Sequence, residues 1–161
     1  MFKLFKKKEK THMLGAVAKG QAVPLSQVND PTFSQGILGE GAAVIPAEGK
    51  IYSPADGKVE MVFETLHALS ITADFGAEVL VHVGLDTVQL KGEGFEAHVE
   101  AGAAVKKGDL LLTVDLDKVK AAGYDTVVPV IICNTADYGK VEGITGREMA
   151  PGDDFIAVTE K

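Results

Sequence analysis

The sequence predicts an all-β fold: an antiparallel β-sandwich or barrel of many short strands, with one or two short helical turns. Glycine and proline recur at short intervals from Pro24 to Gly152, which leaves little room for long helices. Short apolar segments lie between these turn signals, as they do in sandwiches and barrels. The 161 residues are 46% hydrophobic, enough for the core of one domain without a disulfide or a metal.

The expected strands are the short apolar segments between the turns. The clearest of them are residues 42–45, 59–63, 68–71, 78–83, 110–114, 127–133 and 155–158. Residues 115–123 instead predict a short helix, because they begin with aspartate, continue with lysines and end in glycine, an order that compensates a helix dipole. A second helical turn is expected near residues 31–35.

The charge is distributed unevenly along the chain. Residues 1–14 are expected to form a basic flexible leader, and residues 15–161 a single domain. The first ten residues hold five lysines and one glutamate, whereas the rest holds 11 basic and 22 acidic residues. The acidic body excludes nucleic acid as the partner, because phosphate binding needs a basic surface. The leader also carries Phe2, Leu4 and Phe5, so weak contact with an anionic membrane surface is an alternative to a solvated leader.

The sequence also predicts a cellular compartment. The basic residues are not followed by the apolar stretch of about 7–15 residues that a signal peptide has. The longest apolar run, residues 127–133, is far shorter than the ~20 residues that span a bilayer. The single Cys133 cannot form an internal disulfide, and its apolar neighbours Ile131 and Ile132 predict that it is buried. A cytoplasmic, reducing location is therefore expected.

The most informative segment is a predicted β-hairpin with a histidine in each strand. Its strands are residues 67–72 and 77–83, and its loop is residues 73–76. With a loop of two or four residues, His67 lies directly opposite His82 on one face, with Cβ atoms about 4.5–5.5 Å apart. A three-residue loop without a bulge would send the two side chains to opposite faces. Gly76 would permit such a bulge, so the register stays open at this point.

Two imidazoles that face each other suit phosphoryl chemistry. One ring can attack a phosphoryl group, while the other donates a hydrogen bond to the phosphoryl oxygens or fixes the tautomer of its partner. Thr65 lies two residues before His67, on the same face of the expected strand, and would orient its ring; Asp86 supplies a carboxylate soon after His82. A histidine in an apolar strand is more often a core residue with satisfied hydrogen bonds, and that alternative also stays open.

The hairpin and its flanks resemble a known family: the glucose-family enzyme IIA (type 1) of the bacterial phosphoenolpyruvate:sugar phosphotransferase system. The resemblance rests on residues 63–68, FETLHA, and residues 78–95, EVLVHVGLDTVQLKGEGF. It continues through residues 39–41, 54–57 and 105–109 and covers roughly residues 20–160. The family has a cytosolic β-sandwich domain that carries a phosphoryl group on a histidine.

The resemblance implies a role for each of these residues. His82 would accept a phosphoryl group on Nε2 from the phosphocarrier HPr and pass it to a cysteine on the enzyme IIB domain of a sugar permease. His67 would support the phosphoryl group, Thr65 would orient His67, and Asp86 would be a carboxylate at the rim. The partner-binding rim would consist of Asp30, Phe33, Leu38, Phe63, Leu80 and Val88. No cofactor is required, and family members often also regulate other proteins.

Other interpretations remain open at the level of sequence. In a zinc peptidase, His67 and His82 would be ligands, but a third ligand and a general base would be needed. A biotinyl or lipoyl carrier is suggested by residues 105–111, yet the nearest candidate, Lys118, falls in the expected helix. The two histidines could also hold Zn²⁺ if a partner supplied a third ligand. His12, in the leader, and His98, in a polar strand, receive no functional role.

Overall fold

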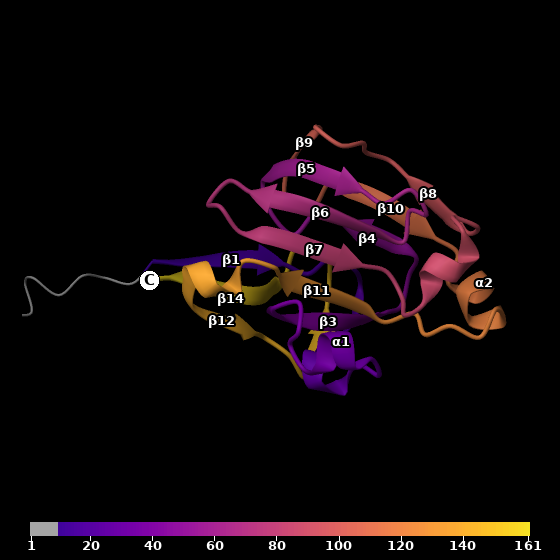
Figure 1. Ribbon diagram of the computed structural model, residues 1–161, viewed down its shortest axis with the longest axis horizontal. Coiled ribbons are helices and arrows are strands. Elements are labelled where there is room, and N and C mark those ends of the chain that lie inside the picture. Colours follow the sequence, from indigo (N-terminus) through magenta and orange to yellow (C-terminus); the bar gives the residue numbers. More distant parts are fainter. Residues whose placement is uncertain (1–9) are drawn as a thin grey trace, which may run out of the picture.

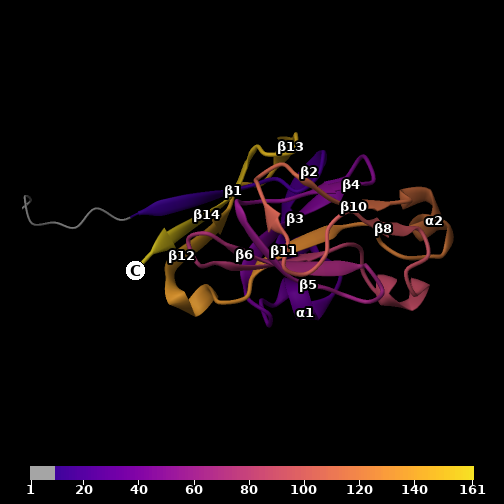
Figure 2. The same cartoon turned by 90° about the horizontal axis from the view of Figure 1, so that it is seen from above.

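The computed structural model describes residues 10–161 and consists mainly of antiparallel strands (Figure 1). The all-β prediction is confirmed, and the α-helices of the described residues are two short ones. Figure 2 shows that β1 (Thr11–Gly15) and β14 (Asp154–Glu160) lie at one end of the molecule and that α2 (Leu116–Ala121) lies at the other. No helix within residues 10–161 is long and apolar enough to cross a membrane.

Most of the strands belong to one large sheet. Its eight strands run in the order β13-β2-β3-β11-β7-β6-β5-β9. Their bounds, in chain order, are β2 (Gly20–Pro24), β3 (Glu40–Pro46), β5 (Gly57–Val62), β6 (Ala68–Ala73), β7 (Glu78–His82), β9 (Ala104–Val105), β11 (Val128–Ile132) and β13 (Arg147–Met149). The predicted hairpin is therefore the pair β6–β7, near the middle of this sheet.

Two smaller sheets complete the structure. One has the order β1-β14-β12 and the other β4-β10-β8. Their strands are β1 (Thr11–Gly15), β4 (Lys50–Tyr52), β8 (Phe95–Ala97), β10 (Leu110–Val114), β12 (Tyr138–Gly143) and β14 (Asp154–Glu160). Short 3₁₀-helices occur at η2 (Leu25–Gln27), η3 (Thr87–Leu90) and η4 (Thr135–Asp137).

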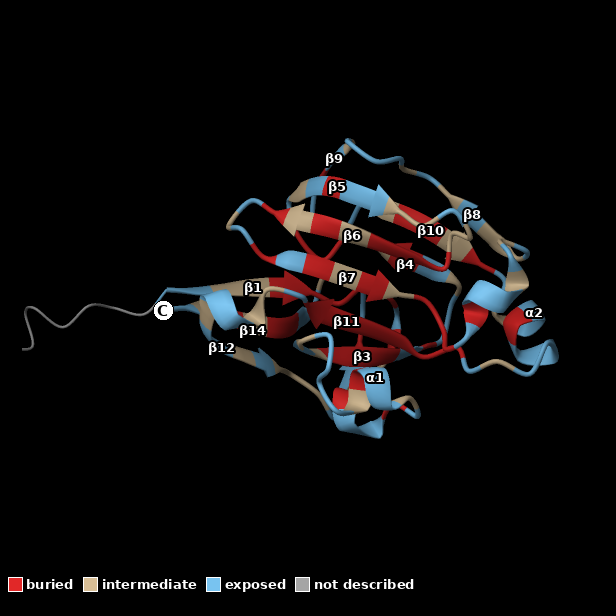
Figure 3. Cartoon of the chain, viewed as in Figure 1, coloured by how far each residue is buried: buried red, intermediate tan, exposed pale blue. Residues whose placement is uncertain are grey.

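Side chains on the large sheet alternate between two apolar clusters. On β11, Val130 and Ile132 belong to the main core, whereas Ile131 between them belongs to a smaller cluster on the opposite face. Phe33 of α1 (Pro31–Ser34) is 3% exposed and packs in this smaller cluster. Figure 3 shows that β11 is buried along its whole length and that most of β3 is buried. The outer face of the sheet is thus covered locally by α1.

Both predicted helical turns are confirmed, each with an aspartate at its N-cap. The side chain of Asp30 accepts a hydrogen bond from the backbone N–H of Thr32 at 3.0 Å, and Pro31 occupies the first turn of α1. The helix α2 (Leu116–Ala121) begins after Asp115, whose side chain accepts from the N–H of Lys118 at 3.1 Å. Lysines lie in the last turn of α2, as its dipole favours.

The predicted end of the leader at residue 14 is wrong. Strand β1 already begins at Thr11 and pairs with β14, and Leu14 is completely buried. His12, assigned to the leader, lies in this strand; its Nε2 bonds to Glu160 at 2.5 Å. The run of lysines ends at Lys10, and the apolar residues after it can pack, which is why the strand starts there. Residues 1–9 of the predicted leader lie outside the described residues.

The predicted register of the hairpin is wrong by one residue. His82 pairs with Ala68, and Thr72 pairs with Glu78. The loop consists of residues 74–76, closed by a hydrogen bond from the Ala73 N–H to the Ala77 carbonyl at 2.9 Å. Gly76 takes a φ of 103°, which makes this three-residue connection accessible. His67 therefore lies just before β6 rather than within it.

Replacing Leu14 with alanine tests whether β1 is part of the core. Leu14→Ala is expected to lower the free energy of unfolding by about 2–5 kcal/mol, because the side chain is fully buried. Leu38→Ala is the matched control, because that leucine is 39% exposed and its loss should cost less than about 1 kcal/mol. Urea denaturation of both variants measures the difference. Equal costs for the two variants would contradict the assignment of β1 to the core.

Candidate active site

His82, the last residue of β7, is held by the backbone just after it. Its Nδ1 lies 2.7 Å from the carbonyl oxygen of Gly84. A carbonyl oxygen only accepts hydrogen bonds, so Nδ1 must carry the proton. In a neutral ring the proton on Nδ1 leaves Nε2 with a free lone pair. His82 is half-buried, so Nε2 is the nucleophilic atom of a partly open site.

His67 is more deeply buried than His82 and is held by a turn between β5 and β6. Its side chain is 5% exposed, and its Nδ1 lies 2.6 Å from the hydroxyl of Thr65. The turn is closed by a hydrogen bond from the Leu66 N–H to the Phe63 carbonyl at 2.8 Å. Leu66 takes a φ of 61°, which is uncommon for a leucine. Thr65 is therefore in a turn, and its predicted place on a strand face is wrong.

The two histidine rings meet in spite of the shifted register. Their centroids are 4.9 Å apart and their planes are inclined by 79°. In a regular strand, His67 would lie on the same face as Leu69, toward the main core. The left-handed conformation of Leu66 ends the regular alternation just before His67. This local turn brings the His67 ring to His82, an effect that the predicted pairing ascribed to strand register.

Burial keeps both rings neutral at physiological pH. Burial, and in second place the charge of His82, lowers the pKa of His67 from 6.5 to about 4. The pKa of His82 is also lowered by burial, against the hydrogen bond to Gly84 and the negative charges of Asp30 and Asp86. A neutral imidazole is required for nucleophilic attack, so the apolar surroundings favour the reactive form of His82.

An aromatic side chain lies against each histidine ring, and several other predicted rim residues are apolar and partly exposed. The ring of Phe33 lies 5.0 Å from the His82 ring, and that of Phe63 lies 5.3 Å from the His67 ring. Leu80, two residues before His82 on β7, packs against the smaller apolar cluster. Leu38 and Val88 are 39% and 43% exposed, which is unusual for large apolar residues.

Two further exposed apolar residues were not predicted from the sequence. Ile37 and Met61 are 66% and 48% exposed. Met61 lines a groove of about 240 Å³ that also includes Phe63 and Leu80. Cys133, predicted to be buried, is exposed and lines the same groove, because the apolar strand β11 ends at Ile132. Partial desolvation within the groove, and in second place the negative charge of Glu78, raise the pKa of its thiol. Glu60 and Met61 are both exposed because the pairing of β5 with β6 is irregular between Val59 and Met61, which local sequence does not signal.

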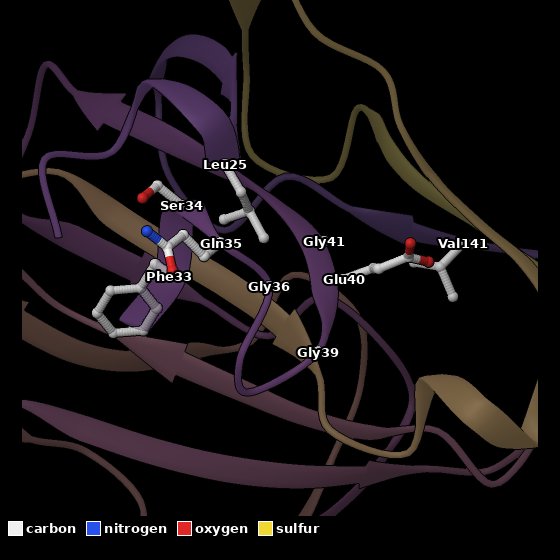
Figure 4. A pocket seen from close by; sticks show the side chains of 9 residues that line it. All are labelled: Leu25, Phe33, Ser34, Gln35, Gly36, Gly39, Glu40, Gly41 and Val141. Carbon is white, nitrogen blue, oxygen red and sulfur yellow. The ribbon is translucent and has the colours of Figure 1, made fainter. Parts of the chain in front are cut away.

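A second groove beside α1 does not contain the histidines. It has a volume of about 320 Å³ and lies between α1 and the strands β3 and β12. Figure 4 shows Phe33, Ser34 and Gln35 on one side and Glu40 with Val141 on the other. Phe33 is the residue that links this groove to the site, since its ring also contacts His82.

The histidine pair lacks a third metal ligand of its own. Among residues 10–161, no three or more His, Cys, Asp or Glu side chains form a group that could hold a metal ion. A peptidase site that uses His67 and His82 would need such a group. Lys118, the candidate of the biotinyl or lipoyl interpretation, lies in α2 and not at a hairpin tip.

The fold and the site together define a class of protein. A neutral histidine with a free Nε2 and a second neutral histidine against it characterise a histidine-based group-transfer domain. Residues 12–138 match the family model of the phosphoenolpyruvate-dependent sugar phosphotransferase system, EIIA 1. The chain belongs to this family of phosphoryl carriers, and the resemblance drawn from the sequence is confirmed.

Similar proteins agree with this assignment. A glucose-specific EIIA component of the phosphotransferase system from Oceanobacillus iheyensis is 42% identical over 156 residues, 97% of this chain and 94% of that protein. A β-glucoside-specific EIIBCA component from Halalkalibacterium halodurans is 47% identical over 140 residues, 87% of this chain. This chain matches only 22% of that longer protein. The solved structure of the glucose permease IIA from Mycoplasma capricolum has a TM-score of 0.82 and 33% identity, covering 92% of this chain and 96% of that one.

The low pKa of His67 gives a test in solution. NMR titration of histidine-labelled protein should show His67 with a midpoint near pH 4 instead of 6.5. As the pH falls below 6.5, the unfolded chain takes up a proton that the folded chain excludes. The free energy of unfolding therefore falls as the pH drops from 6.5 to about 4, whereas above pH 6.5 the stabilising contribution of the neutral His67 ring is fully present.

A variant separates the two causes of this shift. In His82→Ala, the smaller cause is removed while burial remains, so the midpoint of His67 should rise only part of the way toward 6.5. A wild-type midpoint at or above 6.5 would contradict the neutral pair. A full return to 6.5 in the variant would show that the charge of His82, and not burial, is the main cause.

Proposed function

We propose that Nε2 of His82 accepts a phosphoryl group from phosphorylated HPr and passes it to the cysteine of an enzyme IIB domain. The observation that carries this proposal is the hydrogen bond between His82 Nδ1 and the Gly84 carbonyl, which leaves Nε2 free. The family itself transfers phosphoryl groups in sugar uptake.

Each step is an in-line displacement at phosphorus. The Nε2 lone pair forms a bond to phosphorus while the bond between phosphorus and the donor breaks, and its electron pair returns to the donor. In the second step, a thiolate of the acceptor attacks the phosphorus, and the N–P electron pair returns to Nε2. The proton stays on Nδ1 of His82 throughout and is donated to the Gly84 carbonyl. Such transfers depend mainly on positioning and on stabilising charge.

His67 supports the transferred group in this proposal. Its ring is neutral, so it carries one proton, and its Nδ1 contacts the Thr65 hydroxyl at 2.6 Å. When the hydroxyl donates to Nδ1, the proton lies on Nε2 of His67, where it can be donated to a phosphoryl oxygen. Thr65 would then fix the tautomer of His67 as Gly84 fixes that of His82.

The surface around the site suits transient docking. Leu38, Met61 and Val88 are exposed apolar residues, and Asp30 and Asp86 add negative charge at His82. Partners with an apolar centre and basic residues around it would fit such a surface. HPr and enzyme IIB fulfil this role in the proposal, which also places the protein in the cytoplasm.

The transported sugar, a regulatory role and metal binding extend the same proposal. The names of relatives point to glucose or a β-glucoside as the transported sugar. Regulation of other proteins would use the same surface and would depend on phosphorylation of His82. No cofactor is needed for the transfer, but Zn²⁺ could bind His67 and His82 if a partner supplied the third ligand.

Phosphorylation with labelled phosphoenolpyruvate tests the assignment. In the presence of enzyme I and HPr, ³²P should label the wild type at one histidine, and His82→Ala should abolish the labelling. His67→Ala should still be labelled, but transfer to an enzyme IIB domain should fall by about 10²-fold, the usual cost of losing one donor to the transferred group. Labelled protein is separated on gels to measure both steps.

His98→Ala is the matched control for these variants. His98 is an exposed histidine whose Nε2 contacts the Thr113 hydroxyl at 3.2 Å, and it does not contact the pair. This variant should be labelled and discharged like the wild type. Label that persists in His82→Ala would refute the proposal.

A further inference from the structure

We propose that Thr87 is a positioning residue for the phosphorylated histidine. Its buried hydroxyl would hold the loop after β7 so that the Gly84 carbonyl keeps the His82 proton on Nδ1. This inference rests on the proposed function for its consequence in transfer. The orientation of the ring can be measured without any transfer.

Thr87 is a fully buried polar residue at the start of η3. Its exposed fraction is 0%, and its hydroxyl donates to the carbonyl of Val83 at 2.6 Å. A buried hydroxyl is costly unless it makes a hydrogen bond, so this bond is its compensation. Val83 follows His82 directly, and so the hydroxyl acts on the backbone next to the nucleophile.

Hydrogen bonds hold the two peptide units on either side of Gly84. The unit between Val83 and Gly84 is held at its N–H by the Val127 carbonyl, at 2.9 Å, and at its carbonyl by Thr87. The unit between Gly84 and Leu85 is held at its N–H by the Asp125 carbonyl, at 3.0 Å. The carbonyl of this second unit accepts the bond from His82. The direction of that carbonyl therefore depends on how both units are fixed.

The two peptide units meet at Gly84, so its φ and ψ angles set their relative orientation. Its φ is 82°, a conformation that glycine adopts easily, and a glycine also leaves it more readily than any other residue. A Cβ at this position would lie 2.5 Å from Cγ2 of Thr87, so the methyl group of Thr87 occupies that space. The methyl group of Thr87 thus fills the space beside Gly84, whereas its hydroxyl holds the first peptide unit.

Loss of the hydroxyl should release the first peptide unit at its carbonyl end. Gly84 would then sample other conformations, and its carbonyl would turn away from His82 for part of the time. Without this acceptor, an imidazole side chain favours the tautomer with the proton on Nε2. When Nε2 carries the proton, its lone pair is used in the N–H bond and cannot attack phosphorus.

Two substitutions separate the hydroxyl from the methyl group. Thr87→Val keeps the shape and removes the hydroxyl, whereas Thr87→Ser keeps the hydroxyl and removes the methyl group. The tautomer of His82 is measured from ¹⁵N chemical shifts of the full chain labelled with ¹⁵N-histidine. Losing one net hydrogen bond should shift the tautomer equilibrium of Thr87→Val away from Nδ1–H by about five- to tenfold. Phosphoryl acceptance from HPr should slow to a similar extent, and Thr87→Ser should restore both.

Ser53→Ala is the control for loss of a buried hydroxyl elsewhere. Ser53 is also 0% exposed, and its hydroxyl donates to the Ala55 carbonyl at 2.7 Å, between β4 and β5. This variant should lose stability with no change in the tautomer of His82. A wild-type tautomer in Thr87→Val, or the same shift in Ser53→Ala, would overturn the inference.

The serine variant decides the matter if Thr87→Val does not fold. The Nδ1–H tautomer should persist in Thr87→Ser, and its loss there would overturn the role of the hydroxyl. Failure of the proposed function would look different. In that case the tautomer would still shift in Thr87→Val, but the wild type would not be labelled on His82.

Discussion

The hydrogen bond from His82 Nδ1 to the Gly84 carbonyl is the interaction on which the site depends. It places the one proton of a neutral ring on one nitrogen and leaves the other free for attack. The bond forms because the chain turns back just after β7, at a glycine with a φ of 82°. The N–H groups of Gly84 and Leu85 donate to the carbonyls of Val127 and Asp125, so the turn is held by the segment just before β11. A local backbone feature thus selects the reactive atom.

The position of the site on the sheet explains its chemical state. His82 lies on the outer face of the large sheet, where α1 and the smaller apolar cluster cover part of the surface. Phe33 from that cluster and Phe63 from the β5–β6 turn contact the two rings. The cover is enough to lower both histidine pKa values, yet it leaves His82 half-buried and within reach of partners. Partial burial therefore serves both reactivity and docking.

Much of the fold could be predicted from the sequence, because its signals are local. Regular glycine and proline spacing predicted short strands, and the order of aspartate, lysine and glycine in residues 115–123 predicted α2. The histidine pair was also predicted, but from the wrong geometry. Its contact depends on a three-residue loop at residues 74–76 and on a leucine, Leu66, in a left-handed conformation. A leucine carries no sequence signal for that conformation, so only the structure could reveal it.

Errors at the edges of elements have a common physical cause. Whether β1 begins at residue 11 depends on pairing with β14, which is far away in the sequence. The exposure of Cys133 depends on where β11 ends, although the apolar run continues to it. Thr87 looked like an ordinary residue of the family signature, since only the structure shows its bond to Val83. Long-range contacts, and not local composition, determine these features.

The most direct test is to locate phosphorus within the phosphorylated protein. One-bond coupling between ³¹P and ¹⁵N, measured on protein labelled with ¹⁵N-histidine, identifies the nitrogen that carries the phosphoryl group. We expect coupling between ³¹P and Nε2 of His82, with a proton retained on Nδ1. Coupling to Nδ1 of His82, or to a nitrogen of any other histidine, would contradict it.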